Sequence, residues 1–412
     1  MNKFPLPIQL PSTRFFQFTG LLALLLCTGL GSSTGYTASL STNDDVYDEI
    51  SRIESEQGAY GAELSEHLMA LATNYQEHGR HEDAVEAYKR AIHVQRINEG
   101  LYNLNQVPMI EHLIDSQIAM GDWEEATKRY AHLFWLHQRN FGADDPRMLP
   151  VLDKLSYWHL NAFSLGQSAM ANHLMSAYQM FSMSVDIIHD NYGENDLKMI
   201  KPLKGLAISN YYLATLKAQE SRNSAAMTMR TNQEMEAERK ARLDHYILNS
   251  YYNGKQAIVQ MIDIYEAAPE ANPADLAAAR VQLGDWYMLF DRTNAAMDEY
   301  LQAYSQLQSN EKLVDIGTTL FATPKALPDL PTLETEAHDN NRPHDYVVVK
   351  FDVTARGTTR NIDILEAGPN DSVGNRAMVR RNLKIAKFRP RLENGEAVDT
   401  VGIVHRYIIP KS

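Results

Sequence analysis

The chain has 412 residues, a formal net charge of −13 and 44% hydrophobic residues, and this length predicts two or three domains. The acidic balance excludes a general nucleic-acid binder, which needs basic surface to displace counterions from phosphates. The only cysteine is Cys27, so neither a disulfide within one chain nor a cysteine-based metal site can form.

Residues 1–38 have the pattern of an export signal. Lys3 and Arg14 supply positive charge, an apolar run follows from Phe15 to Leu26, and a small, polar segment ends at Ala38. The run is shorter than the roughly 20 apolar residues that a membrane span needs. We therefore expect a cleaved signal peptide and export to the periplasm.

Two alternatives stay open for this segment. The apolar run, extended to Leu30, predicts an uncleaved inner-membrane anchor instead of a signal peptide. Cys27 is a candidate for lipidation, but Leu24-Leu25-Leu26 lacks the small residue that usually precedes a lipidated cysteine. The favoured interpretation of Cys27 is a small apolar residue within the signal.

Two later stretches carry small and aromatic residues at identical offsets, which place them on one face of paired helices. The first set is Ala72, Tyr75, Ala84, Tyr88 and Ala91, and the second is Gly284, Tyr287, Ala296, Tyr300 and Ala303. Turns are expected at Gly79-Arg80 and at residues 291–294. This order of sizes resembles the tetratricopeptide repeat. One such hairpin cannot bury its own apolar face, so we predict a mainly α fold, with a stacked α-solenoid over residues 39–310.

The junctions between the predicted repeats also recur. Asn98-Glu99-Gly100 is followed 42 residues later by Asn140-Phe141-Gly142, and Asn191-Tyr192-Gly193 lies 51 residues beyond that. Each glycine can end a helix with a positive φ, and a proline a few residues on fits the first turn of the next helix. These long units, with Asp144-Asp145-Pro146 in one junction, resemble the repeats of kinesin light chains. The third unit is expected to have longer helices.

Two parts of the chain are less regular. Residues 203–268 predict one or two degenerate repeats, with a break at Asn253-Gly254. Residues 311–345 predict an extended linker, because prolines fix backbone torsions and remove donors. The prolines of this stretch are Pro324, Pro328, Pro331 and Pro343.

The C-terminal residues change from a helical to an alternating period. Val347, Val349, Phe351 and Val353 alternate with other residues, which predicts a strand, and Arg356-Gly357 predicts the turn after it. A second strand is expected at Ile362 and Ile364, a helix from a cap at Asp371 or Ser372 to Ala386, a turn at Asn394-Gly395, and a final strand from Val401 to Ile409. The predicted order is strand, strand, helix, strand (β-β-α-β).

This order, with Lys387-Phe388-Arg389-Pro390-Arg391 ahead of Asn394-Gly395-Glu396-Ala397-Val398, resembles the C-terminal domain of the TonB energy-transducer family over residues 346–412. The resemblance implies a periplasmic domain that captures a segment of outer-membrane receptors by adding a strand to a sheet edge. The apolar run lacks the histidine of that family, and helical repeats replace its proline-rich spacer. Strand addition is therefore the property that carries over, and the final strand, with Val401, Ile403 and His405, is the expected edge.

The charge is unevenly distributed. Residues 340–412 hold 13 Lys/Arg and 8 Asp/Glu, a balance of +5, and the rest holds 26 and 44, a balance of −18. The positive charge concentrates at Arg380, Arg381, Lys384, Lys387, Arg389 and Arg391. The favoured interpretation is a solvated helix face. The alternative is a patch for anionic partners, namely peptidoglycan, lipid headgroups or the acidic repeats of this chain.

No sequence motif for nucleophilic catalysis, phosphate binding or dinucleotide binding is present, so we predict a protein that is not an enzyme and needs no cofactor. His78 and His81 flank one turn, but a metal site would need further ligands, and an exposed turn is favoured. His405 is expected on a sheet face.

The prediction from the sequence is a periplasmic, non-enzymatic adaptor. A peptide or helix of a protein partner would bind a groove of the repeats, with Asn74, Glu77 and Asp285 as groove residues. The resemblance adds outer-membrane receptors or transport components as partners of the C-terminal domain. The alternatives are a membrane-anchored TonB-type energy transducer and a peptidoglycan-associated cell-envelope factor.

Overall fold

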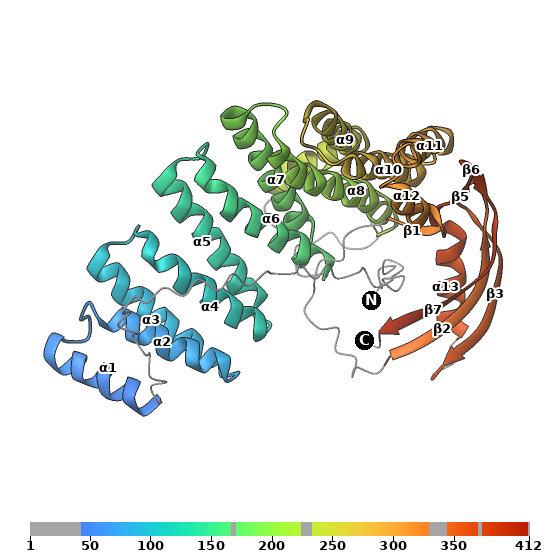
Figure 1. Ribbon diagram of the computed structural model, residues 1–412. Coiled ribbons are helices and arrows are strands. Elements are labelled where there is room, and N and C mark those ends of the chain that lie inside the picture. Colours follow the sequence, from blue (N-terminus) through green and yellow to red (C-terminus); the bar gives the residue numbers. More distant parts are fainter. Residues whose placement is uncertain (1–42, 166–169, 224–232, 329–343, 370–372, 411–412) are drawn as a thin grey trace, which may run out of the picture. The chain divides into compact units, whose positions relative to one another are not determined.

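The computed structural model describes residues 43–165, 170–223, 233–328, 344–369 and 373–410 (Figure 1). Within these ranges the chain forms two compact units, which divide between residues 155 and 156. Each helix in these ranges is either too short or too polar to span a bilayer. The predicted export signal, residues 1–38, lies outside the described residues.

The first unit consists of consecutive helices joined by short turns and junctions. These are α1 (Asn43–Gln57), α2 (Leu64–Glu77), α3 (His81–Glu99), η1 (Leu104–Gln106), α4 (Val107–Ala119), α5 (Trp123–Phe141), η2 (Pro146–Met148) and the first part of α6 (Leu149–Ser164). Neighbouring helices in the sequence pack against each other, as hairpins do. The predicted helical-hairpin architecture is therefore present here.

The hairpin of α2 and α3 packs as its residue sizes predict. Ala72, Ala84 and Ala91 are completely buried, and so is the ring of Tyr88. Small side chains let the two backbones approach, and the aromatic ring fills the space beside them. The hydroxyl of Tyr88 lies 3.0 Å from Thr73 Oγ1 and donates to Gln76 Oε1 at 2.9 Å, so the buried polar atom is satisfied.

The repeated junctions have one geometry. Gly100 and Gly142 have φ angles of +94° and +92°, which side chains strongly disfavour. The side-chain amides of Asn98 and Asn140 donate to the carbonyl four residues earlier, and also to the carbonyls of Tyr60 and Tyr102. The same bonds, 42 residues apart, tie each helix end to the loop one junction earlier. The predicted role of the junction glycines is confirmed.

The second unit continues the helices. After the end of α6 come α7 (Met170–Tyr192), η3 (Leu197–Met199), α8 (Ile200–Asn223), α9 (Gln233–Ala267), α10 (Pro273–Leu289), α11 (Thr293–Gln308) and α12 (Val314–Phe321). The 23 residues of α7 exceed the 19 of α3 and α5, as the longer spacing of the third unit predicts.

The predicted break at Asn253-Gly254 is wrong, because α9 runs through it without interruption. A Cβ on Gly254 would lie 2.1 Å from the Trp286 ring of α10. The glycine therefore makes room for a large ring rather than ending the helix. Gly284 of α10 also makes room for a ring, since a Cβ there would lie 2.4 Å from the Tyr300 ring of α11.

The predicted linker is partly wrong. Within residues 311–345 the structure places α12 and the strand β1 (Lys325–Leu327). Phe321 of α12 is buried, with its ring 6.0 Å from the rings of both Tyr300 and Tyr304. The proline spacing predicts an extended chain, but it carries no information about these few apolar residues, which pack on the last hairpin. Residues 329–343, with Pro331 and Pro343, lie outside the described residues.

The C-terminal module is built on a three-stranded antiparallel sheet in the order β3-β2-β7. Its elements are β2 (His344–Val353), β3 (Thr359–Gly368), α13 (Val373–Ile385), β4 (Lys387–Arg389), β5 (Arg391–Glu393), β6 (Glu396–Val398) and β7 (Thr400–Pro410). The predicted β-β-α-β order is present, with the short strands β4, β5 and β6 added before the last strand. The predicted cap, Asp371 or Ser372, lies outside the described residues.

The inner face of the sheet forms a core with α13. Val347, Val349 and Phe351 of β2 are completely buried and lie in one apolar cluster with Val379 and Leu383 of α13. The alternation of the sequence therefore predicted the correct face of β2.

Two histidines face each other between α6 and α7. The Nδ1 atoms of His159 and His173 are 2.9 Å apart, so one ring must donate a proton and the other accept it. Burial, and then the neighbouring His173, lower the pKa of His159 to about 4. A second proton on this pair is therefore disfavoured in the folded chain.

This pair predicts a loss of stability on acidification. The unfolded His159 takes up a proton near its ordinary pKa of about 6.5, whereas the folded one does so only at about 4. The contribution of His159 to the free energy of unfolding is therefore fully present above about pH 6.5 and is lost as the pH falls toward 4. Between pH 7 and pH 5 the free energy of unfolding should fall by about 2 kcal/mol. Urea unfolding followed by circular dichroism at the two pH values should show a smaller loss in His159→Gln. The exposed His189→Gln is the control, and equal losses in the two variants would contradict the assignment.

Candidate partner-binding surfaces

Two of the predicted groove residues lie on α2 of the first unit. Glu77 is exposed at the last position of α2, and Asn74 is half-buried one turn earlier. The Oδ1 atom of Asn74 is buried and has no hydrogen-bond partner among the residues that the structure describes. Both residues stay predicted contacts for a partner on the first helix of this hairpin.

The third predicted groove residue, Asp285, is only 7% exposed and is bound from within the chain. Arg389 of β4 donates to it from Nε at 2.9 Å and from Nη2 at 2.5 Å. The Tyr300 hydroxyl donates to the same carboxylate at 2.7 Å. The prediction that Asp285 lines a groove is therefore wrong, because β4 of the C-terminal module occupies this part of α10.

The environment fixes the protonation of this cluster. Burial, and then the negative charge of Asp285, raise the pKa of Tyr300 well above its ordinary value. Tyr300 therefore stays protonated and remains a donor to Asp285. Arg389 is 4% exposed, so the guanidinium and the carboxylate are both removed from water and neutralise each other.

The position equivalent to Asp285 in the first hairpin is occupied by a neutral residue. Asp285 and Tyr300 correspond to Thr73 and Tyr88 in the repeat pattern, and Tyr88 is satisfied by neutral Thr73 and Gln76. In the last hairpin an acid replaces the threonine, and an arginine from outside the hairpin completes the bonds. A comparison of the two repeats would have shown a charge at a buried position, and a buried charge needs a partner.

The predicted basic patch is divided between two uses. Arg389 is buried against Asp285, Lys387 forms an ion pair with Asp291, and Arg391 pairs with Glu393. The favoured prediction of a solvated helix face and the alternative of one patch for anionic partners are therefore both wrong for these three residues, which are paired within the chain. Arg380, Arg381 and Lys384 lie exposed on α13.

The predicted binding strand β7 lies at an edge of the sheet, next to β2 alone among the described strands. Val401 is 69% exposed, whereas Ile403 is half-buried and His405 is 8% exposed. The rings of His405 and Tyr407 pack edge-on on the inner face of the sheet, with their centroids 4.5 Å apart. Val401 is thus accessible to a partner's side chains, and His405 has the sheet-face position that its alternation predicted.

An aromatic pair that the sequence analysis missed recurs on the first unit. Tyr60 and His93 have ring centroids 5.7 Å apart, and 42 residues later Tyr102 and Trp135 have centroids 5.2 Å apart. Tyr60, Tyr102 and Trp135 are 52%, 45% and 41% exposed. Each exposed ring offers an apolar face against which a partner's side chains can pack. The 42-residue spacing found at the junctions would have identified these rings.

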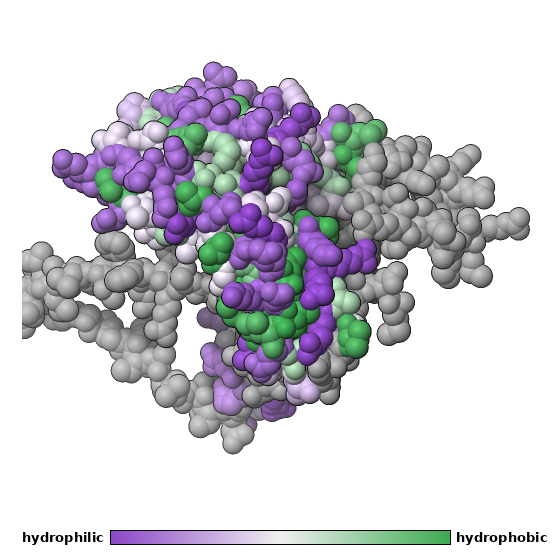
Figure 2. All heavy atoms as spheres, turned by 90° about the vertical axis from the view of Figure 1, so that its right-hand side faces the viewer, coloured by the Kyte–Doolittle hydropathy of each residue, from purple (hydrophilic) through white to green (hydrophobic). Residues whose placement is uncertain are grey.

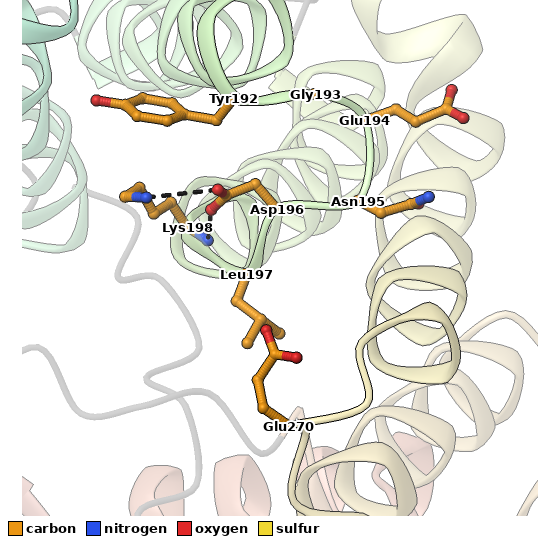
Figure 3. Close-up of a pocket in the computed structure, with 8 residues that line it drawn as sticks. All are labelled: Tyr192, Gly193, Glu194, Asn195, Asp196, Leu197, Lys198 and Glu270. Carbon is orange, nitrogen blue, oxygen red and sulfur yellow. Dashed lines mark hydrogen bonds and ion pairs between the residues drawn. The ribbon is translucent and has the colours of Figure 1, made fainter.

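A hollow of about 660 Å³ lies at the junction of α7 and α8 (Figure 3). Its wall includes Asp196, which accepts hydrogen bonds from the backbone and side chain of Lys198, and Tyr192, whose ring lies 4.2 Å from the Lys198 ammonium. In Figure 3 Glu194 points away from this group, whereas the side chain of Glu270 extends toward Leu197. The charges of Asp196 and Lys198 neutralise each other, which is typical of a structural junction.

No group of three or more metal-ligating side chains lies together in the described ranges. His78 is exposed, and its Nδ1 lies 2.8 Å from the Asn74 carbonyl oxygen of its own helix. His81 begins the following helix, α3.

No protein-family model matches the sequence, and no curated protein matches it. Among solved structures, BtubC (BKLC) from P. vanneervenii is similar, with a TM-score of 0.37 and 13% identity over 65% of this chain and 89% of that chain. A protein of Podosopora anserina described as a kinesin light chain with nearly identical TPR-like repeats gives 0.38 and 13% over 64% and 98%. A point variant of it gives 0.39 and 13% over 61% and 98%.

The buried ion pair predicts a large and specific loss of stability. Arg389→Gln leaves Asp285 buried without its cation, which costs about 3–5 kcal/mol of unfolding free energy. Arg391→Gln, two residues away, removes a partly exposed pair with Glu393 and costs less than about 1 kcal/mol. Chemical denaturation of both variants measures the difference, and similar losses would contradict the assignment.

A double substitution tests whether Arg389 stabilises the chain through its ion pair with Asp285. Asp285→Thr with Arg389→Gln recreates the neutral partners of the first hairpin, so it should recover at least about 2 kcal/mol of the summed single losses. Strictly additive losses would show that Arg389 acts independently of Asp285.

Proposed function

We propose that this chain is an exported, non-enzymatic scaffold that binds protein partners through its helical repeats and through the free edge of its C-terminal sheet. The observation that carries the second site is the long regular part of β7, because its one register shift lies near the start of the strand, at Gly402, whose φ is +73°. This strand pairs with β2 without interruption from His344↔Pro410 to Phe351↔Ile403. The outer side of such an edge presents unpaired N–H and C=O groups in register, which can pair with an extended segment of another protein.

The opposite edge is less suited to this use. The pairing of β3 with β2 shifts register between Val348 and Val349 and again between Lys350 and Asp352. Asn361 on β3 has a φ of +52°. Bulges of this kind interrupt the row of backbone groups and protect an edge from added strands. The contrast favours β7 as the binding edge.

The side chains of β7 supply further contacts. Val401, Val404 and Ile408 are 69%, 57% and 60% exposed. Figure 2 views the side of the molecule on which the strands lie in Figure 1, and it shows apolar side chains among hydrophilic ones. An added strand would place its own side chains beside these aliphatic groups. We therefore expect an extended partner segment with apolar residues at alternate positions.

The helical repeats are the other proposed site. Stacked hairpins present extended surfaces for binding. Asn74 and Glu77 lie on the first helix of one hairpin, and the exposed aromatic rings of the first unit recur with the repeat. A peptide or helix of a partner with apolar anchors fits these rings. Transport components of the cell envelope are the proposed partners, with an anchored energy transducer and a peptidoglycan-bound factor as the alternatives.

Export predicts a specific mature terminus. If residues 1–38 are a cleaved signal, N-terminal sequencing of the protein from cells should give a start near Ser39. Fractionation of the same cells should recover the protein in the periplasmic fraction. Retention of Met1–Gly31 in the membrane fraction would contradict this proposal and support the anchored transducer.

Strand addition predicts that a charge on β7 weakens partner binding. A photoreactive amino acid at Val404 should form a crosslink to one partner in cells, and Ile408→Lys should reduce its yield by about 10-fold, because a charge on the edge disfavours pairing. Leu365→Lys is the matched control, since Leu365 is 56% exposed on β3. Amide exchange of β7 should also slow in the isolated complex. Equal yields from the two variants would overturn the proposal.

A further inference from the structure

A second surface of the C-terminal module lies between α13 and β3, away from the edge of β7. It is a hollow of about 650 Å³. Its cationic lining residues are Arg376, Arg380, Arg381 and Lys384, and apolar lining comes from Ile364, Val373 and Ile385. Among the residues that the structure describes, no aspartate or glutamate lines it. The combination of several cations with apolar groups indicates an amphiphilic, anionic ligand.

Three of the cations are unused within the described chain. Arg380, Arg381 and Lys384 are exposed, and none of them forms an ion pair with a residue that the structure describes. Their spacing of one and three residues puts them on adjacent turns of α13. Clustered guanidinium and ammonium groups bind phosphate through charge-assisted hydrogen bonds. The other cations of the predicted patch differ, because Lys387 and Arg389 are paired with acids of the last hairpin.

The apolar residues distinguish a lipid from a small anion. Val373 is 83% exposed and Ile385 is 67% exposed, at the first and last positions of α13. A helix of this length separates them by about 18 Å, at 1.5 Å per residue. A free phosphate would use only the cations between them. Two protruding aliphatic side chains on either side of a cationic hollow fit the surface of a bilayer. There the aliphatic side chains can enter the acyl region while the cations bind the headgroups.

An acidic peptide is a poorer match. A peptide that bound beside β3 by strand addition would need regular backbone partners on that strand. The two register shifts of β3 and the positive φ of Asn361 interrupt them. A membrane surface needs no such partners.

We infer that the hollow between α13 and β3 binds the headgroups of anionic phospholipids at a membrane surface. Each cation near an anionic leaflet adds affinity that falls off within a Debye length of about 8–10 Å. This role is separate from partner binding at β7, and neither depends on the other.

The test uses the full chain and vesicles of phosphatidylcholine with or without phosphatidylglycerol. Arg380→Gln, Arg381→Gln and Lys384→Gln together should weaken binding to the anionic vesicles by about 100-fold. The matched control neutralises Lys312, Lys350 and Arg356, which are exposed elsewhere, and gives the same change in net charge. It should change binding by less than about 3-fold. Equal effects of the two triple variants would overturn the inference.

A local probe separates this site from the apolar N-terminal run. After Cys27→Ser, a fluorophore on Ile385→Cys should shift to the blue with anionic vesicles and not with neutral ones. The same fluorophore on Val401→Cys, on the outward side of β7, should not respond. An equal response of the Ile385 probe to neutral vesicles would overturn the inference. So would equally tight binding of soluble glycerophosphoglycerol or of a polyglutamate peptide.

Discussion

The buried ion pair between Asp285 and Arg389 is the interaction on which the second unit depends. Both side chains are almost completely removed from water, and the hydroxyl of Tyr300 binds the same carboxylate. Two buried charges are tolerated only when each neutralises the other with good geometry. If β4 left α10, the Asp285 carboxylate would lose its cation and the two hydrogen bonds from Arg389. The strands of the C-terminal module and the last helical hairpin are therefore held together by more than their apolar contacts.

The apolar contacts around this pair have the same consequence. Leu327 of β1 and Leu392 of β5 lie in one cluster with residues of α10 and α11, whereas Ala326 and Phe388 lie in the core of the sheet. The two-stranded ladder of β1 and β4 thus forms a wall between two cores. A stack of helical repeats needs its last apolar face covered. Here the C-terminal module covers that face, and this holds β7, an edge strand among the described strands, in a fixed position relative to the last hairpin.

The sequence predicted those features that depend on local spacing. Residue size along α2, α3, α10 and α11 predicted the hairpins, glycines at 42-residue spacing predicted the junctions, and alternation predicted β2 and β7. It did not predict features that depend on contacts between distant segments. Local spacing predicts a groove position for Asp285, because the arginine that binds it is more than 100 residues away. It predicts a break at Gly254, because Trp286 comes from another helix. It predicts one basic patch near residue 389 for the same reason, although three of its six residues are paired within the chain.

Native-state hydrogen exchange on the full chain tests most directly whether the module and the last hairpin are one cooperative body. Amides of α10, α11 and β2 should exchange through a common opening, with free energies of opening that agree within about 1 kcal/mol. The same amides should lose protection together in a variant that lacks the Arg389 guanidinium. Exchange of β2 through openings at least about 2 kcal/mol easier than those of α10 and α11 would show that the sheet opens alone, and would contradict the account.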